Sequence, residues 1–201
     1  MIDTLITGGT GYIGSQLVKK LDKKKIKIVS RKKIYDIETV VCDLKTQTIP
    51  EEEFNGIKTV YHLAGIAHDT SSKKMELDYF RLNVFTTEDL ILKSIKFNVN
   101  TFVFLSSTFA SDIDEKKLVL NENDQFEPTD IYGKSKREAE KLIIKHLSGK
   151  NMHFTILRPT VVYGEKLKGN LNLMYKLTKY RVLPSVPETN NKKTLIHISD
   201  L

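Results

Sequence analysis

Short apolar runs alternate along the chain with segments whose apolar residues recur every three or four positions. The runs are rich in Val and Ile and are apolar on both faces, which is typical of parallel strands buried between helix layers. They lie at residues 3–7, 26–30, 39–43, 59–64, 101–107 and 154–159. This alternation predicts an α/β fold with a doubly wound parallel sheet, in which ligands bind at the carboxyl ends of the strands.

The clearest helical pattern is the segment GKSKREAEKLIIKHL, which precedes the last of these runs. Its spacing predicts an amphipathic helix with one apolar face. The residues expected to face the core are Ala139, Leu142, Ile143 and Leu147. The residues expected to face water are Lys134, Arg137 and Lys141.

Glycines cluster where the first strand passes into the first helix, in the stretch TGGTGYIG. Gly8 permits a tight turn, Gly11 lets a pyrophosphate approach the backbone, and Gly14 lets helix and strand pack closely. The N-terminus of the helix adds N–H groups and partial positive charge. Because a strand precedes the glycines and a helix follows them, the pattern predicts dinucleotide binding rather than a purely structural turn.

The end of the second strand carries basic residues where NAD-binding proteins place an acid for the ribose 2′-hydroxyl. The sequence there is SRKK, and the first acid is Asp36. A guanidinium without that carboxylate favours a 2′-phosphate, so Arg31 favours NADP over NAD. Alternatively, Arg31 stacks on the adenine without any phosphate preference.

Tyr132 and Lys136 open the long helix and lie on one face, because they are four residues apart. A free tyrosine has a pKa near ~10 and is a poor base at neutral pH. The adjacent ammonium is expected to lower the pKa of Tyr132. Ser106, Ser107 and Thr108 end a predicted strand, and a hydroxyl there would bind the substrate oxygen that Tyr132 deprotonates.

Composition narrows the class of protein. The 201 residues are 40% hydrophobic and 28% charged, as in a soluble globular protein. The net charge of +7 comes from scattered lysines without arginine–aromatic interleaving, so no nucleic-acid partner is expected. No apolar run approaches membrane-spanning length and no signal-peptide pattern is present, so we expect a cytoplasmic protein without a membrane partner. The single cysteine, Cys42, is expected to be a buried hydrophobe, and no metal site is expected.

Together these segments resemble the extended short-chain dehydrogenase/reductase family, in particular its NAD-dependent epimerase/dehydratase group, which acts on nucleotide sugars. The resemblance also includes CDL, HLAG, RLNV and LRPTVVYG, and it covers essentially the whole chain. It implies a Rossmann fold over residues 1–164 and the start of a substrate-binding region over residues 165–201. Because family members usually continue beyond the segment resembling NKKTLIHISDL, we expect this chain to lack the C-terminal substrate region.

The resemblance implies roles for individual residues. Tyr132 is expected to be the general acid and base, Lys136 its electrostatic partner and Ser107 the catalytic hydroxyl. Thr108 is the rival to Ser107, because the family's V-Y-G is replaced here by FAS. The expected cofactor contacts are Gly8, Gly11, Tyr12, Ile13, Gly14, Arg31, Asp43, Leu44, Leu63, Ala64, Gly65, Tyr132, Lys136 and Pro159. The expected substrate contacts are Ser107, Thr108 and Asn170.

Four further residues have structural or substrate-side interpretations. Asn83 is expected to tie the central strands and helices together, and Arg158 is expected to be structural. His62 lies within a strand and is expected to be a core histidine with satisfied hydrogen bonds. His68, in the loop after HLAG, is a candidate substrate contact.

The resemblance also narrows the reaction. Dehydratases of this group carry an Asp-Glu pair directly after the catalytic hydroxyl, and its absence here argues against dehydration. A nucleotide-sugar 4-epimerase or 4-ketoreductase remains, and both transfer a hydride between sugar C4 and the nicotinamide of NAD or NADP. The alternative is a catalytically idle NAD(P)-binding regulatory or sensor domain, which would not need the Tyr132–Lys136 pair. A homodimer through the helices containing 84–97 and 134–148 is also implied.

Overall fold

The structure, a computed structural model, describes residues 1–66, 76–111, 127–164, 169–182 and 194–201. The chain forms two compact units, Met1–Arg158 and Pro159–Leu201. The predicted division between a cofactor region and a substrate region after residue 164 stays a prediction.

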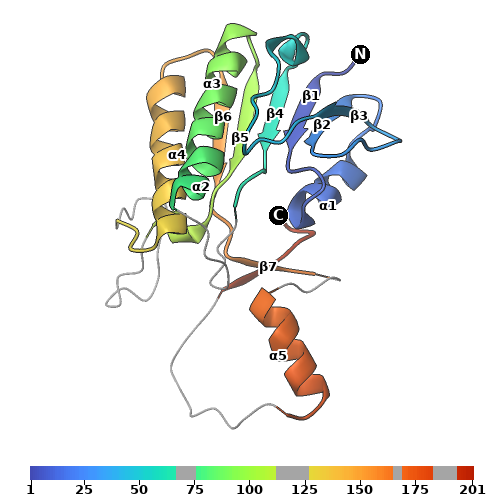
Figure 1. Cartoon of the computed structure of the whole chain (residues 1–201), viewed down its shortest axis with the longest axis vertical. Coiled ribbons are helices and arrows are strands. Elements are labelled where there is room, and N and C mark those ends of the chain that lie inside the picture. The colour runs from blue at the N-terminus through green and yellow to red at the C-terminus, as the bar shows by residue number, and fades with distance from the viewer. Residues whose placement is uncertain (67–75, 112–126, 165–168, 183–193) are drawn as a thin grey trace. The chain divides into compact units, whose positions relative to one another are not determined.

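A six-stranded sheet forms the centre of the first unit, with strand order β3-β2-β1-β4-β5-β6 (Figure 1). Every neighbouring pair is parallel. The strands are β1 (Thr4–Thr7), β2 (Ile26–Ser30), β3 (Glu38–Val41), β4 (Thr59–His62), β5 (Thr101–Leu105) and β6 (His153–Leu157). The strand order changes direction between β1 and β4, so the predicted doubly wound parallel sheet is confirmed.

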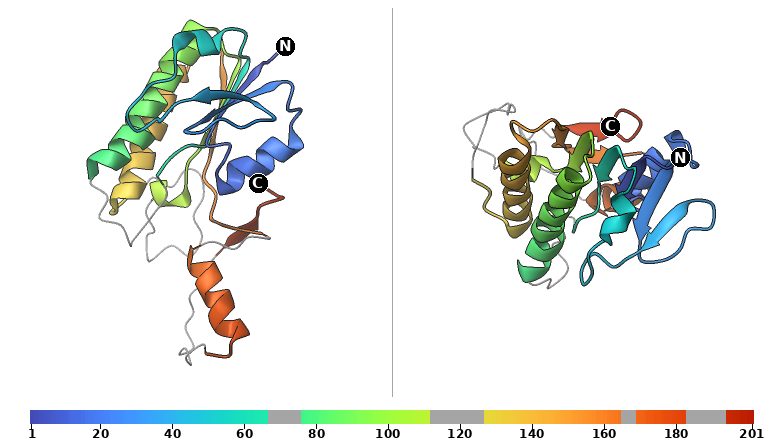
Figure 2. Two further views of the ribbon diagram at one scale, coloured as in Figure 1. Left: turned by 45° about the vertical axis from the view of Figure 1, so that its right-hand side comes forward. Right: turned by 90° about the horizontal axis from the view of Figure 1, so that it is seen from above.

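Helices cover both faces of this sheet. Helix α1 (Tyr12–Lys20) lies on one face, and α3 (Thr86–Lys96) and α4 (Ile131–Leu147) lie side by side on the other (Figures 1 and 2). Because successive side chains of a strand point to opposite faces, Leu5 joins the core under α3 and α4, whereas Ile6 joins the core under α1. Among the described residues, the unit also contains four short elements: the 3-10 turns η1 (Glu51–Phe54) and η3 (Thr108–Ala110), helix α2 (Glu76–Phe80) and the π-helical turn η2 (Arg81–Phe85).

Four predicted strands extend two residues too far at their carboxyl ends. The Leu63 N–H donates to Thr7 at 3.1 Å and the Ser106 N–H donates to Leu157 at 2.7 Å, and beyond these bonds both segments leave the ladder. The segments after β4 and after β5 therefore lie at the edge of the sheet where folds of this kind bind ligands.

Helix α4 departs from its predicted amphipathic pattern at one position. Asp130 caps it, its carboxylate accepting a hydrogen bond from the Gly133 N–H at 3.0 Å. Lys134 is exposed as expected, but Arg137, which was expected to face water, is only 6% exposed. The cause is a buried carboxylate one turn away: Arg137 Nη1 lies 3.5 Å from Glu140 Oε2.

The second unit contains elements that the sequence patterns did not predict. Strands β7 (Val161–Tyr163) and β8 (Leu195–His197) pair in parallel, and helix α5 spans Gly169–Lys179. The Ile198 N–H donates to Tyr163 at 2.8 Å. Across the described ranges of the whole chain, no helix combines the length and the apolar character needed to cross a membrane.

Candidate functional site

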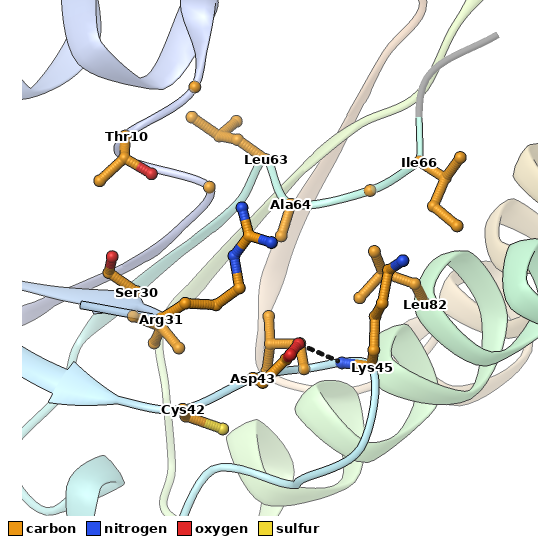
Figure 3. Close-up of a pocket in the computed structure, with 15 residues that line it drawn as sticks. Thr10, Ser30, Arg31, Cys42, Asp43, Lys45, Leu63, Ala64, Ile66 and Leu82 are labelled. Atoms are coloured by element: carbon orange, nitrogen blue, oxygen red, sulfur yellow. Dashed lines mark hydrogen bonds between the residues drawn. The ribbon is translucent and has the colours of Figure 1, made fainter. Parts of the chain in front are cut away.

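A pocket of about 360 Å³ opens at the carboxyl ends of β1, β2, β3 and β4 (Figure 3). It lies where the strand order changes direction, which is the usual ligand site of such sheets. Eight of the predicted cofactor contacts line it: Gly8, Gly11, Arg31, Asp43, Leu44, Leu63, Ala64 and Gly65.

The glycine loop forms one wall of the pocket and leaves no space for side chains. Gly8 has a φ of +71°, and a Cβ built on it would lie 2.6 Å from the Ala64 nitrogen. A Cβ on Gly14 would lie 2.2 Å from the Gly8 carbonyl oxygen, so Gly14 packs against the loop itself rather than against a strand. Helix α1 begins directly after Gly11, whose lack of a side chain leaves the first-turn N–H groups for a ligand.

Charged side chains gather at the opposite wall, after β2 and β3. Arg31 extends into the pocket, and Lys45 lines it from the loop after β3 (Figure 3). The Asp43 carboxylate accepts a hydrogen bond from the Lys45 N–H at 3.1 Å, which fixes the turn that presents both residues. Sequence reasoning missed Lys45, although its position two residues after Asp43 was a usable signal. Cys42 is buried as expected, and burial raises the pKa of its thiol.

Tyr132 lies in the first turn of α4 and is 8% exposed. A hydrogen bond with Ser107 favours its phenolate, but burial has the larger effect, so the pKa of Tyr132 is raised. The expectation that Lys136 lowers this pKa is therefore wrong, because the loss of hydration on burial outweighs the effect of the hydrogen bond with Ser107. The choice between Ser107 and Thr108 as the catalytic hydroxyl stays a prediction, and Ser107 is the one for which a hydrogen bond with the tyrosine is found.

Lys136 is buried beneath the end of β5. Its Nζ donates to the Leu105 carbonyl at 2.8 Å and lies 4.6 Å from the centre of the Phe104 ring. Burial lowers the pKa of Lys136 to about 8, against an opposing effect of Glu140. A Cβ on Gly65 would lie 3.1 Å from Nζ, so the lysine closely approaches the backbone of a residue that lines the pocket.

Asn83 joins the segment after β4 to helix α4. Its Oδ1 accepts from the Ile66 N–H at 2.8 Å, and its Nδ2 donates to the Ile66 carbonyl at 3.2 Å and to Ser135 Oγ at 2.9 Å. The Ser135 hydroxyl in turn donates to the Tyr132 carbonyl at 2.8 Å. The expected tying role of Asn83 is confirmed.

His62 is a core histidine, as expected. It is fully buried, with Nδ1 2.7 Å from Thr7 Oγ1 and Nε2 2.8 Å from Thr87 Oγ1. The Thr87 hydroxyl donates to the Asn83 carbonyl at 2.7 Å, so it can only accept from His62, whose Nε2 therefore carries the proton. Burial lowers the pKa of His62 to about 3, which keeps the ring neutral.

Some predicted site residues are not brought to the pocket wall, or are not described. Tyr12, Ile13 and Gly14 begin α1 and are not among the lining residues. Pro159 belongs to the second unit, and His68 and the Asn170 side chain fall outside the described part of the chain, so these contacts stay predictions. Among the described residues, no group of three or more His, Cys, Asp or Glu side chains is placed to hold a metal.

Comparison with known proteins supplies a family. The sequence profile of the NAD dependent epimerase/dehydratase family matches residues 4–198. UDP-glucose 4-epimerase of Vibrio cholerae is 34% identical over 209 residues, which cover 98% of this chain and 63% of that protein. The chain thus spans about six tenths of the length of curated relatives that it matches. The resemblance predicted from the motifs is confirmed.

Solved structures agree on the fold. MoeE5 in complex with UDP-glucuronic acid and NAD is 26% identical with a TM-score of 0.77, and the match covers 98% of this chain and 68% of that chain. UDP-N-acetylglucosamine 4-epimerase from Bacillus cereus has a TM-score of 0.82 at 22% identity, and the match covers 100% of this chain and 68% of that chain.

Proposed function

Because the chain belongs to the NAD dependent epimerase/dehydratase family, we propose that it binds NAD(P) and transfers a hydride between C4 of a nucleotide sugar and the nicotinamide. One observation carries the proposal: Tyr132 is hydrogen-bonded to Ser107 and lies one helical turn before the buried Lys136. A tyrosine, a hydroxyl and a fixed cation are the groups that a proton transfer coupled to hydride transfer requires.

The described residues fit a dinucleotide. Gly8 and Gly14 form a cradle that a Cβ would fill, and the first-turn N–H groups of α1 suit a pyrophosphate. The pocket volume of about 360 Å³ is within the range of small-molecule sites. When bound, the nicotinamide supplies the hydride acceptor and donor that these side chains cannot supply.

The proposed proton path uses this chain's own residues. The Tyr132 phenolate takes the proton of the sugar 4-hydroxyl as the hydride leaves C4 and becomes the phenol, which returns that proton when the hydride comes back. Ser107 holds both oxygens by hydrogen bonds. The Lys136 ammonium, protonated at neutral pH because its pKa is about 8, stabilises the phenolate before the proton is taken and after it is returned.

At the adenosine end we propose a preference for NADP. Two cations, Arg31 and Lys45, line this part of the pocket, and a 2′-phosphate would pair with both. The opposing consideration is Asp43, a carboxylate on the same wall that suits a free ribose hydroxyl. Titration of the purified chain with NAD and NADP, followed by thermal shift, decides between them, and equal shifts would remove the preference.

The relatives named as 4-epimerases favour epimerisation over net reduction. The test is incubation of the full chain with a UDP-, GDP- or dTDP-sugar panel and substoichiometric oxidised dinucleotide, with the products followed by proton NMR. A 4-epimer formed in excess over dinucleotide supports the epimerase. A ketoreductase instead consumes reduced dinucleotide in proportion to a 4-keto sugar, measured by absorbance. A chain that binds no dinucleotide would overturn the proposed function.

We also propose a homodimer formed through α3 and α4. The two helices lie side by side, and each exposes an apolar residue, Leu92 at 51% and Ile144 at 50%. A pair of helices from each copy would bury these residues in a four-helix bundle. Light scattering at micromolar concentration tests this, and a monomer would contradict it.

A further inference from the structure

A buried carboxylate that the proposed reaction does not use lies one helical turn after Lys136. Glu140 is 1% exposed. Its Oε1 accepts from Ser106 Oγ at 2.5 Å and from Arg158 Nε at 2.8 Å, and its Oε2 accepts from Arg158 Nη2 at 2.6 Å. Arg137 Nη1 lies 3.5 Å from Oε2. Both carboxylate oxygens therefore have partners, which a buried charge requires.

These contacts close a ring around the end of β5. The Ser106 N–H donates to the carbonyl of Leu157, and the residue after Leu157 is Arg158, which holds Glu140. The Glu140 carboxylate closes the ring by accepting a hydrogen bond from the Ser106 hydroxyl. Ser106 is thus held at its backbone by β6 and at its side chain by α4. Its direction in space is fixed, and so is the direction of the next residue, Ser107.

Ser107 is the residue that contacts Tyr132. It leaves the strand with φ and ψ of −159° and 153°, and it caps the 3-10 turn η3 (Thr108–Ala110) by accepting from the Phe109 N–H at 3.3 Å. One hydroxyl thus has two partners, the cap and the tyrosine. A small rotation at Ser106 would separate the Ser107 hydroxyl from Tyr132, because the two hydroxyls meet only if the strand end is held in place.

Glu140 also acts on Lys136 through charge. Lys136, Arg137 and Arg158 are three cations close to this one carboxylate, and two of them are nearly fully buried. Glu140 raises the pKa of Lys136 against the effect of burial. The other charged or titratable groups that the described contacts place beside Lys136 or Glu140 are His62 on β4, Arg137 on α4 and Arg158 after β6. Among these described groups, Glu140 is the one carboxylate.

We propose that Glu140 is a positioning residue of this site, which directs Ser107 toward Tyr132 by holding Ser106 and keeps Lys136 protonated. The catalytic meaning of this role rests on the proposed function. The role itself is visible without turnover, because it predicts changes in the titration of two other side chains.

The first experiment measures the charge effect by NMR of lysine labelled with carbon-13 at Cε, with Lys136 assigned by Lys136→Arg. Glu140→Gln keeps the size of the side chain but removes its charge, and the Lys136 midpoint should fall from about 8 by about one pH unit. The matched control is Glu138→Gln, which removes a carboxylate from the same helix that pairs with Lys141 at 2.7 Å. The control should leave the midpoint unchanged. A folded Glu140→Gln chain with an unchanged midpoint would overturn the proposal.

The second experiment measures positioning and does not depend on the folding of Glu140→Gln. Ser106→Ala keeps the Glu140–Arg158 pair and removes only the bond to Ser106. Because the bond from Ser107 favours the Tyr132 phenolate, its loss should raise the Tyr132 midpoint, read from its carbon-13 Cζ resonance and assigned by Tyr132→Phe. An unchanged Tyr132 midpoint would overturn the positioning role.

The two proposals fail in distinguishable ways. If the chain converts no nucleotide sugar but shows both titration shifts, the proposed function is wrong and the proposed role of Glu140 is supported. If the chain is active but shows neither shift, the proposed function is supported and the role of Glu140 is wrong. If the chain is active, Glu140→Gln should also shift the alkaline limb of its pH–rate profile to lower pH, because the pKa of Lys136 falls. A purely structural role of Glu140 would not cause this shift.

Discussion

The two ends of the site use opposite physical means. At the proposed adenosine end, Arg31 and Lys45 are exposed side chains on loops, and the glycine loop offers backbone N–H groups. At the proposed catalytic end, Tyr132, Lys136 and Glu140 are 8%, 4% and 1% exposed. One end presents charges to solvent, where water and salt screen them. The other end has its charges within the protein, where each depends on its neighbours.

This difference bears on how each end can change. A surface cation can be replaced with little effect on folding, so cofactor preference can vary independently of the fold. A member of the buried group cannot be replaced alone, because the charge left behind loses its partner. The catalytic end is therefore part of the core, and changes there should affect folding and chemistry together.

The largest expected effect is at the catalytic end. Tyr132→Phe removes the proposed proton acceptor and should lower turnover by roughly 10²–10⁴-fold, the usual contribution of a general base. Dinucleotide affinity should stay nearly unchanged, because Tyr132 is not among the residues that line the pocket. Rate measurements beside equilibrium titration test this. Near-normal turnover would remove Tyr132 from its role.

The second prediction concerns the glycine loop and uses two glycines with nearly equal φ. Gly8 has φ of +71° with backbone 2.6 Å from a built Cβ, whereas Gly149 has φ of +76° with nothing within 4 Å. Gly149→Ala should cost only the strain of the left-handed region, about 1–2 kcal/mol. Gly8→Ala adds overpacking and should cost about 2–5 kcal/mol. Urea unfolding gives both values, and equal costs would show that the loop yields to a side chain.

The glycine loop and the strands were predictable because their signals are local. Gly8, Gly11 and Gly14 stand within seven residues of one another, and each strand is a single apolar run. The ring around Glu140 was not predictable, because Ser106 and Arg158 lie 34 and 18 residues away from it. The hydrophobic periodicity of α4 predicted that Arg137 faces water. Periodicity treats every charged residue as exposed to solvent, and it carries no information on a buried partner such as Glu140.

The raised pKa of Tyr132 escaped sequence reasoning for the same reason. The spacing of Tyr132 and Lys136 on one helix face was correctly taken from the sequence, but burial is a property of the packed fold. An argument from neighbouring charge alone therefore predicted the wrong direction.

The third prediction concerns the adenosine end. If Arg31 pairs with a 2′-phosphate, Arg31→Ala should weaken NADP binding by about 1.5–3 kcal/mol and NAD binding by much less. Lys32→Ala is the matched control, because it removes an adjacent exposed cation that does not line the pocket. Isothermal titration of both dinucleotides measures the difference. Equal losses for NAD and NADP would mean that Arg31 stacks on the adenine, and unfolding midpoints should be the same in all three proteins.

The smallest expected effect is a difference in the pH dependence of stability between variants at a buried and at an exposed histidine. The folded chain holds the pKa of His62 at about 3, whereas an unfolded histidine titrates near 6.5. Between these values the unfolded chain binds one proton more, so the contribution of His62 to stability is complete above pH 6.5 and declines as the pH falls. The slope should approach about 1.4 kcal/mol per pH unit. Urea unfolding between pH 6.5 and 5 should show a shallower slope in His62→Gln than in the wild type. His153→Gln, which removes an exposed imidazole from β6, serves as the control variant. If His62→Gln and His153→Gln have the same dependence of unfolding free energy on pH, the buried, neutral His62 is not the group that links stability to pH. The contrast between buried and exposed side chains then does not extend to β4.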